Sequence, residues 1–233
     1  MANPRTTRTR GDLGRIAAAD SVAVIGLGRF GRALALELMA SGTEVLGIDA
    51  NEDIVQSLNG QLSHVVMADS TKEDVLRQLA VPEFDRIVVA IGSDVQSSIL
   101  TTSLLLSFRP QHLWAKALND AHGRILEQLG VQHVIYPEKE MGKRVAHLVR
   151  GSMQDYLEIG DDFALVKTKP GARFVGVPLG ELGIRTEHGV TVTAVKRPGE
   201  RWTYATAETV LTADDVILVT GATRKAEAFS QLR

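Results

Sequence analysis

The chain has 233 residues, of which 44% are hydrophobic, so it is long enough to bury one or two ordinary hydrophobic cores. Its 26 Lys and Arg residues nearly balance its 28 Asp and Glu residues. This balance provides no protein-wide positive field, and we expect no nucleic acid partner. The absence of cysteine excludes thiol catalysis, thiolate zinc sites and disulfides, and is compatible with a reducing cytoplasm.

Residues 1–20 are basic and lack the apolar centre of a signal peptide. Arginines at positions 5, 8, 10 and 15 alternate with Thr and Gly, which predicts a flexible basic tail. Such a tail is either a solvated arm or an arm that touches acidic lipids or a membrane partner. The longest apolar stretch, residues 97–108, is far shorter than the roughly 20 residues needed to cross a bilayer. We therefore expect a cytoplasmic location.

From Ser21 onward, short runs rich in Val and Ile alternate with segments of helical periodicity, as a parallel sheet with crossover helices requires. The predicted strands are Val22 to Ile25, Val45 to Ile48, Val65 to Met67, Ile87 to Ile91, Leu113 to Lys116 and His133 to Ile135. The predicted helices are Phe30 to Ala40, Glu52 to Leu58, Lys72 to Leu79, Gln96 to Ser107, Ala121 to Leu129 and Lys139 to Gly151. This pattern predicts an α/β fold with a Rossmann-like, doubly wound parallel sheet over residues 21–151.

The composition changes after Gly151. Frequent Gly and Pro residues separate short β-branched runs, such as Val190 to Val195 and Val216 to Thr220. We expect a linker at residues 152–160 and a second, smaller, mainly β C-terminal domain at residues 161–233 with one or two helical turns. A unit of this size has a thin core, and pairing with a second copy is a common way to stabilise one.

A glycine fingerprint, Gly26-Leu-Gly28-Arg29-Phe30-Gly31, directly follows the first strand and opens the first helix. Gly26 permits a tight turn, Gly28 permits close approach to a phosphate, and Gly31 permits helix and strand to pack. Asp49 ends the second strand, where a carboxylate accepts hydrogen bonds from ribose hydroxyls and repels a 2′-phosphate. The pattern predicts an adenine nucleotide such as NAD or ATP, the alternative being an empty loop kept for packing.

Arg29 adds a full positive charge and a bidentate fork to the phosphate loop, which suggests an extra phosphate to neutralise. The alternative is an exposed arginine whose stem packs on the surface.

A nicotinamide dehydrogenase needs an acid or base at the hydride site and a substrate domain, and here only the small β unit remains. His188 is its sole histidine and lies in a predicted turn. No histidine is paired with a carboxylate at metal-ligand spacing, and no HExxH, GxSxG or P-loop motif is present. The sequence therefore indicates ligand binding without turnover, that is, no enzyme.

Several motifs in order resemble the RCK (regulator of K+ conductance) N-domain of cytosolic Ktr/Trk-type potassium-uptake subunits. They include the glycine loop, Met-Ala-Asp-Ser-Thr at 67–71, Val-Val-Ala-Ile-Gly at 88–92, Trp-Ala-Lys-Ala at 114–117 and Ile-Tyr-Pro-Glu-Lys-Glu-Met-Gly at 135–142. Residues 163–220, with Gly-Val-Pro-Leu at 176–179, resemble the RCK C-domain. The resemblance implies a regulatory gating-ring subunit that forms rings of eight, binds ATP or ADP (in some members NAD), and controls a separate membrane potassium-transporting subunit.

The resemblance also implies a nucleotide-binding role for residues that follow the strands. The matching positions are Gly26, Gly28, Arg29, Phe30, Gly31, Asp49, Ala50, Asn51, Asp69, Ser70, Ile91, Gly92, Ser93, Lys116, His122 and Glu138. In this comparison Asp49 to Asn51 would hold ribose, and Asp69 and Ser70 would contact adenine, although Asp69 departs from the neutral residue of some members. Glu138 resembles an acidic residue beside the γ-phosphate that shares a cation, Mg2+ or Na+.

Arg29 resembles an arginine that reaches phosphate, including that of a neighbouring subunit. Alternatives remain for two other positions: Lys116 as a surface charge at a strand end and Glu138 as an N-cap.

A second ligand site is predicted near Leu182 to Gly189. Ile184, Arg185 and His188 supply an apolar side chain, a guanidinium and an imidazole, which suit a purine and a phosphodiester. In several members of the resembled family the matching loop, paired across a two-fold axis, binds cyclic di-AMP. The alternative is an ordinary turn with a solvated Arg185.

Two functional hypotheses follow. The first is a nucleotide-binding gating-ring subunit that lies at the inner face of the cell membrane through its partner. The rival is a soluble NAD-dependent oxidoreductase or NAD-sensing protein.

Overall fold

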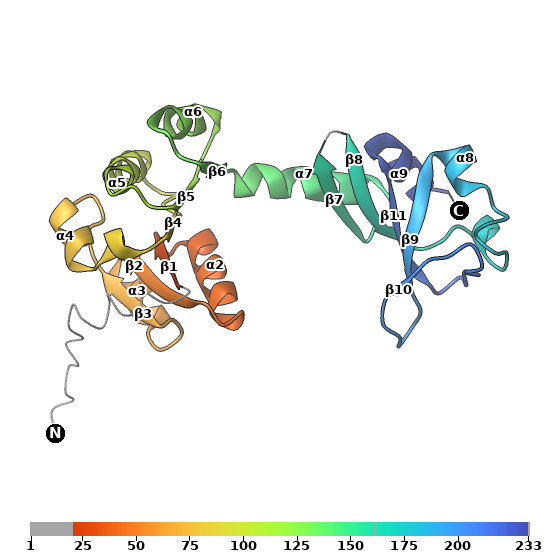
Figure 1. Ribbon diagram of the computed structural model, residues 1–233, viewed down its shortest axis with the longest axis horizontal. Helices are drawn as coiled ribbons and strands as arrows, with labels where there is room; N and C mark the ends of the chain where they lie inside the picture. The colour runs from red at the N-terminus through yellow and green to blue at the C-terminus, as the bar shows by residue number, and fades with distance from the viewer. Residues whose placement is uncertain (1–20, 161, 233) are drawn as a thin grey trace, which may run out of the picture. The chain divides into compact units, whose positions relative to one another are not determined.

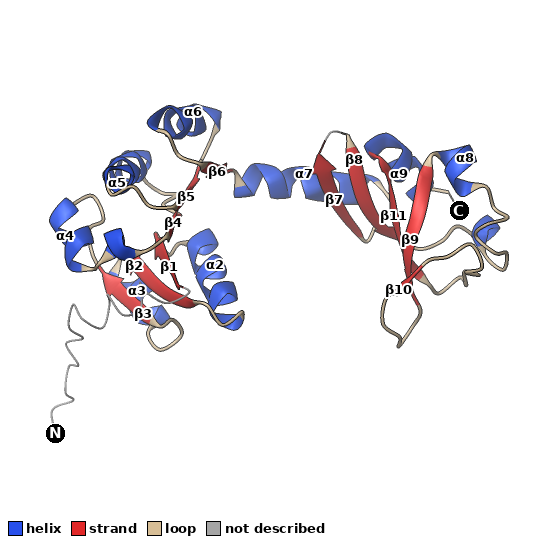
Figure 2. Ribbon diagram, in the orientation of Figure 1, coloured by secondary structure: helices blue, strands red, loops and turns tan. Residues whose placement is uncertain are grey.

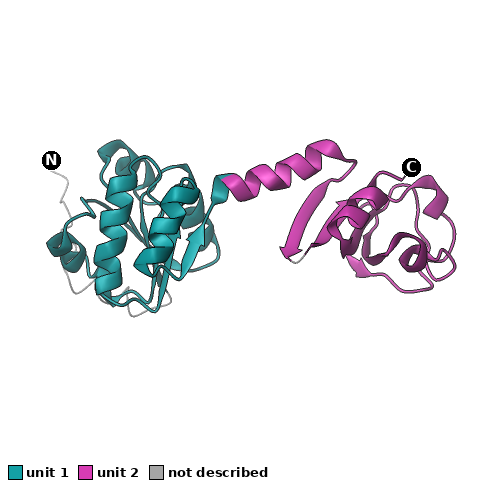
Figure 3. Cartoon of the chain, turned by 90° about the horizontal axis from the view of Figure 1, so that it is seen from above, with its two compact units in different colours: residues 1–138 teal, residues 139–233 magenta. Residues whose placement is uncertain are grey.

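The computed structural model describes residues 21–160 and 162–232, and the basic tail predicted at residues 1–20 lies outside them. The chain divides into two compact units after Glu138 (Figure 3). Each unit contains its own sheet, of six strands in the first and five in the second (Figure 2). The predicted α/β class with a smaller β-rich C-terminal domain is confirmed.

The sheet of the first unit is entirely parallel and has the strand order β3-β2-β1-β4-β5-β6. Its strands are β1 (Ser21–Ile25), β2 (Glu44–Asp49), β3 (His64–Met67), β4 (Arg86–Val89), β5 (His112–Lys116) and β6 (His133–Ile135). The chain proceeds outward from β1 to β3 and then returns to the other side of β1 with β4 (Figure 1). In doubly wound folds this switch point opens a crevice at the carboxyl ends of the strands, where ligands bind.

Helices cover both faces of this sheet because its strands bury alternate side chains on opposite sides. Two helices, α2 (Arg29–Ala40) and α3 (Glu52–Leu58), share a hydrophobic cluster with Val24 of β1. Leu76, Leu105 and Leu126 join the opposite cluster, which contains Ile25. These leucines belong in turn to α4 (Glu73–Gln78), α5 (Val95–Ser107) and α6 (Asp120–Leu129). A short 3-10 turn, η1 (Val81–Glu83), precedes β4.

Three of these helices begin at Asn or Asp side chains that cap them. The side-chain oxygen of Asn51 accepts from the backbone N–H groups of Asp53 and Ile54 at the start of α3. Asp94 and Asn119 cap α5 and α6 in the same way. These caps fix where each loop at the carboxyl edge of the sheet turns into a helix.

The second unit contains an antiparallel sheet in the order β10-β9-β11-β8-β7. Its strands are β7 (Asp155–Gly160), β8 (Phe163–Thr168), β9 (Val190–Lys196), β10 (Thr203–Tyr204) and β11 (Val216–Ala222). The unit also contains most of α7 (Pro137–Arg150), the short helix α8 (Ile184–His188), α9 (Thr223–Ser230) and the 3-10 turn η2 (Ala172–Phe174). Its core includes Val166, Ile217 and Phe229.

The structure differs from the sequence-based boundary in two places. The units divide after Glu138, not near residue 151, because most of α7 packs with the second unit. The stretch expected as a linker, 152–160, includes strand β7, whose Tyr156 pairs with Val166 of β8 and is buried. A buried strand in register with its neighbour is part of the domain, so the linker prediction is wrong over residues 155–160.

Within residues 21–160 and 162–232, no helix is both long enough and apolar enough to pass through a membrane.

Candidate functional site

A cavity of about 760 Å³ lies at the carboxyl edge of the parallel sheet, at the switch point. The loops after β1, β2, β3 and β4 line it, together with Lys116 at the end of β5 and Glu138 at the start of α7. Every residue predicted for the nucleotide site lines this cavity except Gly31 and His122. The topology thus brings together residues that lie more than a hundred positions apart in the sequence.

The three fingerprint glycines have different structural reasons. Gly26 has φ +91°, and a Cβ there would lie 2.8 Å from the backbone nitrogen of Ile91. A Cβ on Gly31 would lie 1.9 Å from the carbonyl oxygen of Gly26, so this glycine lets α2 pack against the loop. Gly28 has no atom within 4 Å of a Cβ, so nothing in the chain itself requires a glycine there. The space beside Gly28 opens onto the cavity, where a ligand can approach the backbone.

The start of α2 supplies a local positive field. Gly28 caps the helix without a side-chain hydrogen bond, and the first turn has no acidic residue. The free N–H groups and the dipole of a twelve-residue helix are therefore available to an anion, with no carboxylate in the first turn of the helix.

Each carboxylate oxygen of Asp49 accepts a hydrogen bond from a backbone N–H group. Oδ2 accepts from the N–H of Leu27 at 2.6 Å, and Oδ1 accepts from the N–H of Asn51 at 2.8 Å. These bonds orient the carboxylate, and each oxygen keeps a lone pair for a further donor. The arrangement suits two vicinal hydroxyl groups.

Other predicted contacts have partners within the chain. The side-chain oxygen of Asn51 caps α3. Ser70 is buried, and its hydroxyl bonds to Thr101 of α5 at 2.9 Å. Asp69 accepts from the N–H and the hydroxyl of Thr71, and Lys72 lies 3.3 Å from its second oxygen. These hydrogen bonds, led by that from the Thr71 hydroxyl, lower the pKa of Asp69 below its ordinary value.

Lys116 and Glu138 form an ion pair at the edge of the cavity. The Lys116 Nζ lies 2.6 Å from Glu138 Oε1, and the lysine side chain is only 8% exposed while that of Glu138 is 63% exposed. The ammonium lies near Gly92, where a Cβ would approach it to 3.1 Å, and 5.8 Å from the centre of the Phe30 ring. The ammonium group of Lys116 is thus largely buried and lines the cavity between the loop after β4 and the start of α7. Its burial excludes the alternative that Lys116 is only a surface charge.

The pKa of Glu138 is held below its ordinary value, first by the hydrogen bond from Lys116 and in smaller part by the positive field of Arg29. Glu138 is the second residue of α7, after Pro137 at the first helical position. Its side chain accepts from Lys116, so the structure gives it an ion-pair role at this edge.

His122 lies outside the cavity. Its ring is almost fully buried at the start of α6, where Nδ1 accepts from the N–H of Leu118 at 3.3 Å. Nε2 has no hydrogen-bond partner, and burial lowers the pKa of the ring. The structure therefore gives His122 a structural position rather than the predicted ligand contact.

Nine residues line the cavity although they were not predicted for the site: Ile25, Ile48, Ile54, Ala68, Thr71, Ala90, Asp94, Ser97 and Leu118. Thr71 and Asp94 lie within the loops that follow β3 and β4, so the rule that ligands bind at the carboxyl ends of strands could have identified them. Ser97 lines the cavity because the first turn of α5 faces it, and this orientation depends on the packing of that helix.

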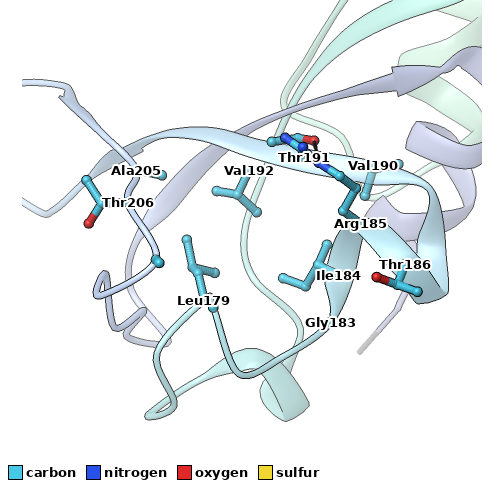
Figure 4. Close-up of a pocket in the computed structure, with 12 residues that line it drawn as sticks. Leu179, Gly183, Ile184, Arg185, Thr186, Val190, Thr191, Val192, Ala205 and Thr206 are labelled. Carbon is cyan, nitrogen blue, oxygen red and sulfur yellow. Dashed lines mark hydrogen bonds between the residues drawn. The ribbon is translucent and has the colours of Figure 1, made fainter.

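A second cavity, of about 390 Å³, lies in the C-terminal unit. Figure 4 shows Leu179, Ile184 and Val192 pointing toward its middle. Arg185 also lines it and donates from Nε to the Thr191 hydroxyl at 3.1 Å.

His188 does not line this second cavity, although the sequence grouped it with Ile184 and Arg185. It ends helix α8 rather than lying in a turn, and its ring packs edge-on against Phe174 and Phe229. Its Nε2 lies 2.8 Å from a guanidinium nitrogen of Arg173. The contacts of His188 with Arg173, Phe174 and Phe229 depend on three-dimensional packing, which the turn prediction could not anticipate.

Among the described residues, no group of three or more His, Cys, Asp or Glu side chains is arranged to hold a metal ion. Glu138 therefore belongs to no such group. A cation bound to its carboxylate would need its remaining ligands from a bound anion or from water.

The fold and the position of its cavity place the first unit in the class of Rossmann-like domains. The sequence matches the family described as the TrkA-N domain over residues 22–137 and the TrkA-C domain over residues 163–232. The chain belongs to the family of RCK-type potassium-uptake proteins of the Ktr and Trk systems.

The Ktr system potassium uptake protein C of Bacillus subtilis (strain 168) is 38% identical over 90% of this chain and 95% of its own. The Ktr system potassium uptake protein A of the same organism is 34% identical over 85% of this chain and 90% of its own. The protein A of Vibrio alginolyticus is 36% identical over 85% and 91%, respectively.

Solved structures share the fold. The crystal structure of the GsuK RCK domain has a TM-score of 0.62 at 20% identity, and the GsuK channel bound to NAD has a TM-score of 0.63 at 20% identity. They match 98% and 99% of this chain, which spans 49% and 41% of those chains.

Proposed function

We propose that the protein is a nucleotide-binding regulatory subunit of a potassium-uptake system and that it controls a separate membrane subunit. The observation that carries this proposal is the likeness to Ktr system potassium uptake proteins over both domains, at 38% identity and 95% of the relative's length. The subunit would lie in the cytoplasm and reach the inner face of the cell membrane through its partner.

The ligand of the first unit is an adenine nucleotide with free ribose hydroxyls, that is, ATP, ADP or NAD. Asp49 supports this choice because its backbone hydrogen bonds hold both oxygens in place for two hydroxyl donors. The same carboxylate would repel a 2′-phosphate, which argues against NADP. Phosphates would lie over Gly28 and the start of α2, where N–H groups are free.

Arg29 and Lys116 would contact the third phosphate of ATP, and Glu138 would contact a cation bound to it. The ion pair of Lys116 with Glu138 supports this reading because an anion near Gly92 would compete with the carboxylate for the ammonium. Glu138 would then be released toward a cation, Mg2+ or Na+, whose other ligands are phosphate oxygens. ADP lacks the phosphate that starts this exchange.

A difference of this kind is what a nucleotide switch requires, since a ligand shifts a conformational equilibrium only through contacts that differ between the two states. In the proposed assembly, an octameric ring, the ATP-bound and ADP-bound geometries would act differently on the membrane subunit.

The second cavity would hold a further ligand, cyclic di-AMP, between two copies of the C-terminal unit. Ile184 and Arg185 support this proposal because they present an apolar wall and a guanidinium to the same cavity. His188 is not part of this proposed ligand site, since its ring packs against Phe174 and Phe229.

We also propose that the protein binds nucleotide without turning it over. No histidine or tyrosine is found among the described residues that line the first cavity, and its lysine, Lys116, is paired with Glu138. Mixing the protein with NADH and a panel of carbonyl substrates should leave the absorbance of NADH unchanged.

The proposed nucleotide site is tested by calorimetric titration of ATP and ADP into the full chain. Asp49→Ala should weaken both nucleotides by about 1–3 kcal/mol because charge-assisted bonds to ribose are lost. Asp53→Ala is the matched control, since Asp53 is exposed on α3 and does not line the cavity. Equal affinities for wild type and Asp49→Ala would refute the site.

Glu138→Gln and Arg29→Ala test the reading of the third phosphate in the same experiment. Each should weaken ATP more than ADP, by roughly tenfold or more, because only ATP reaches these groups. Equal losses for the two nucleotides would show that Arg29 and Glu138 do not distinguish them.

A further inference from the structure

A basic, aromatic hairpin projects from the edge of the C-terminal sheet. It comprises residues 196–204, from the end of β9 to the end of β10, and we call it the edge hairpin. Its loop extends beyond the strands of the sheet in Figure 1. All nine residues are exposed, and none belongs to a hydrophobic core of the unit. Neither the nucleotide cavity nor the second cavity includes any of them.

The shape of the edge hairpin is fixed by its own hydrogen bonds. The N–H of Glu200 donates to the carbonyl of Arg197 at 3.1 Å, with Pro198 and Gly199 (φ +79°) between them, as in a type II turn. Thr203 pairs with Val195, and its hydroxyl donates to the carbonyl of that residue at 3.3 Å. The exposed side chains are therefore held on a preformed structure.

Two aromatic side chains of the edge hairpin face solvent. Tyr204 is 91% exposed and Trp202 is 40% exposed. Tyr204 lies in β10 opposite Ala194, and Trp202 immediately precedes this strand, two residues before Tyr204, a spacing at which side chains of an extended segment share one face. Extending that register by one pair places Lys196 opposite Trp202, on the same face. Exposed tryptophan and tyrosine next to a cation is the composition of a membrane–water interface.

The charges of the edge hairpin are one-sided. It contains three basic residues, Lys196, Arg197 and Arg201, and one acidic residue, Glu200, whereas the whole chain has a net charge of -2. None of these four side chains forms an ion pair with another described residue. The basic groups are therefore free to meet an external anion.

We propose that the edge hairpin is a contact site for an anionic lipid surface. Anionic headgroups attract Lys196, Arg197 and Arg201, while the rings of Trp202 and Tyr204 enter the interfacial region, which suits aromatic residues with a polar tip. Cytoplasmic loops of membrane proteins carry an excess of Lys and Arg, so charge complementarity favours lipid over such loops. This contact is independent of the nucleotide site, and each can fail without the other.

The test is binding of the full chain to phosphatidylcholine vesicles with and without phosphatidylglycerol. The chain has two tryptophans, so Trp114→Phe leaves Trp202 as the only one. Anionic vesicles should shift the emission of Trp202 to shorter wavelength and protect it from acrylamide, and about 0.5 M KCl should reverse both effects by screening. Neutral vesicles should produce neither effect.

Matched variants assign the contact. Lys196→Glu with Arg201→Glu should weaken sedimentation with anionic vesicles by about tenfold or more, and so should Trp202→Ala with Tyr204→Ala. Lys169→Glu with Arg224→Glu makes the same change of charge at exposed positions elsewhere in the unit and should bind like wild type. Circular dichroism checks that each variant is folded.

Three results would overturn the proposal. The first is no binding to anionic vesicles at low salt, in which case the edge hairpin serves another anionic partner. The second is equal loss of binding in the control and edge-hairpin variants. The third is loss of binding only when the arginines of residues 1–20 are replaced by alanine, which would assign the contact to that basic segment.

Discussion

At the scale of single residues, the surroundings of Gly28 and Gly31 predict different effects of substitution at these two glycines of the fingerprint. Gly31→Ala should destabilise the N-terminal unit by about 1–3 kcal/mol because its Cβ would meet the Gly26 carbonyl oxygen at 1.9 Å. Gly28→Ala should leave the free energy of unfolding within about 0.5 kcal/mol, since no atom lies within 4 Å of the new methyl group. Denaturant titration measures both effects.

Gly28→Ala should nevertheless lower the affinity for ATP, because the added methyl group occupies the approach of a phosphate to the backbone. A stable Gly31→Ala variant would show that α2 can shift, and unchanged ATP affinity in Gly28→Ala would show that phosphates lie elsewhere.

His122 makes the stability of the N-terminal unit depend on pH. Burial lowers its pKa in the folded state below the ordinary value of 6.5, so the unfolded chain binds a proton more readily. The contribution of the neutral ring is complete above pH 6.5 and is lost as the pH falls through the lowered folded pKa. His122→Gln should flatten the fall in unfolding free energy between pH 7.5 and pH 5.5, measured by denaturant titration, relative to wild type.

The exposed His112 supplies a control for this pH effect, since His112→Gln should retain the slope of wild type. Identical slopes in wild type and His122→Gln would contradict the assignment.

At the same scale, the glycine loop and Asp49 could be identified from their positions after strands, whereas most of the other residues that line the first cavity were assigned through the resemblance to RCK N-domains. The sequence could not show that the Asn51 oxygen serves as a helix cap or that Ser70 turns toward Thr101, since both depend on three-dimensional packing. His122 follows the fifth strand as predicted but lies beneath the helix start.

At the scale of elements, strands and helices of the N-terminal unit follow from hydrophobic period and capping residues, and the predicted strand positions agree with the sheet. The prediction of a linker before β8 was wrong because Gln154-Asp-Tyr-Leu-Glu-Ile-Gly160 combines polar and apolar residues without a clear alternation. Only pairing with β8 identifies it as a strand.

An ion pair joins α7 to the start of β7. Arg144 donates to Asp155 Oδ1 at 2.6 Å, and this bond chiefly lowers the pKa of Asp155 below its ordinary value of 3.8. A carboxylate with a lowered pKa stabilises the fold above 3.8 and loses that contribution as the pH falls through the folded value. Both side chains are more than 40% exposed, so the contribution is about 0.2–1 kcal/mol at neutral pH.

Arg144→Ala should therefore lower the free energy of unfolding by that amount at pH 7, and the difference from wild type should shrink toward pH 3. Arg150→Ala provides a control on the same helix, where the exposed guanidinium has no ion pair with any residue in the described ranges. A deficit in Arg144→Ala that persists undiminished at pH 3 would show that lost packing, not charge, is responsible.

At the scale of the whole molecule, α7 carries an apolar stripe that the described residues leave exposed. Met141, Val145 and Val149 lie four residues apart on one face and are 54%, 45% and 79% exposed. An exposed stripe of this kind on a helix favours contact with a second copy in closed symmetry. We predict a homo-oligomer, a ring of eight or at least dimers of dimers.

Light scattering at micromolar concentration measures this assembly. Val145→Glu with Val149→Glu should shift the protein to smaller species by placing charges in the interface. A monomeric wild type, or an unchanged assembly in the double variant, would contradict the role assigned to α7.

The central claim is that nucleotide binding at the edge of the parallel sheet regulates potassium uptake. The most direct measurement is potassium uptake at low external potassium in cells that lack this gene and express wild type, Asp49→Ala or Asp53→Ala. Wild type and Asp53→Ala should restore uptake, whereas Asp49→Ala, present at equal amounts, should not. Unchanged uptake on deletion, or full restoration by Asp49→Ala, would contradict the claim.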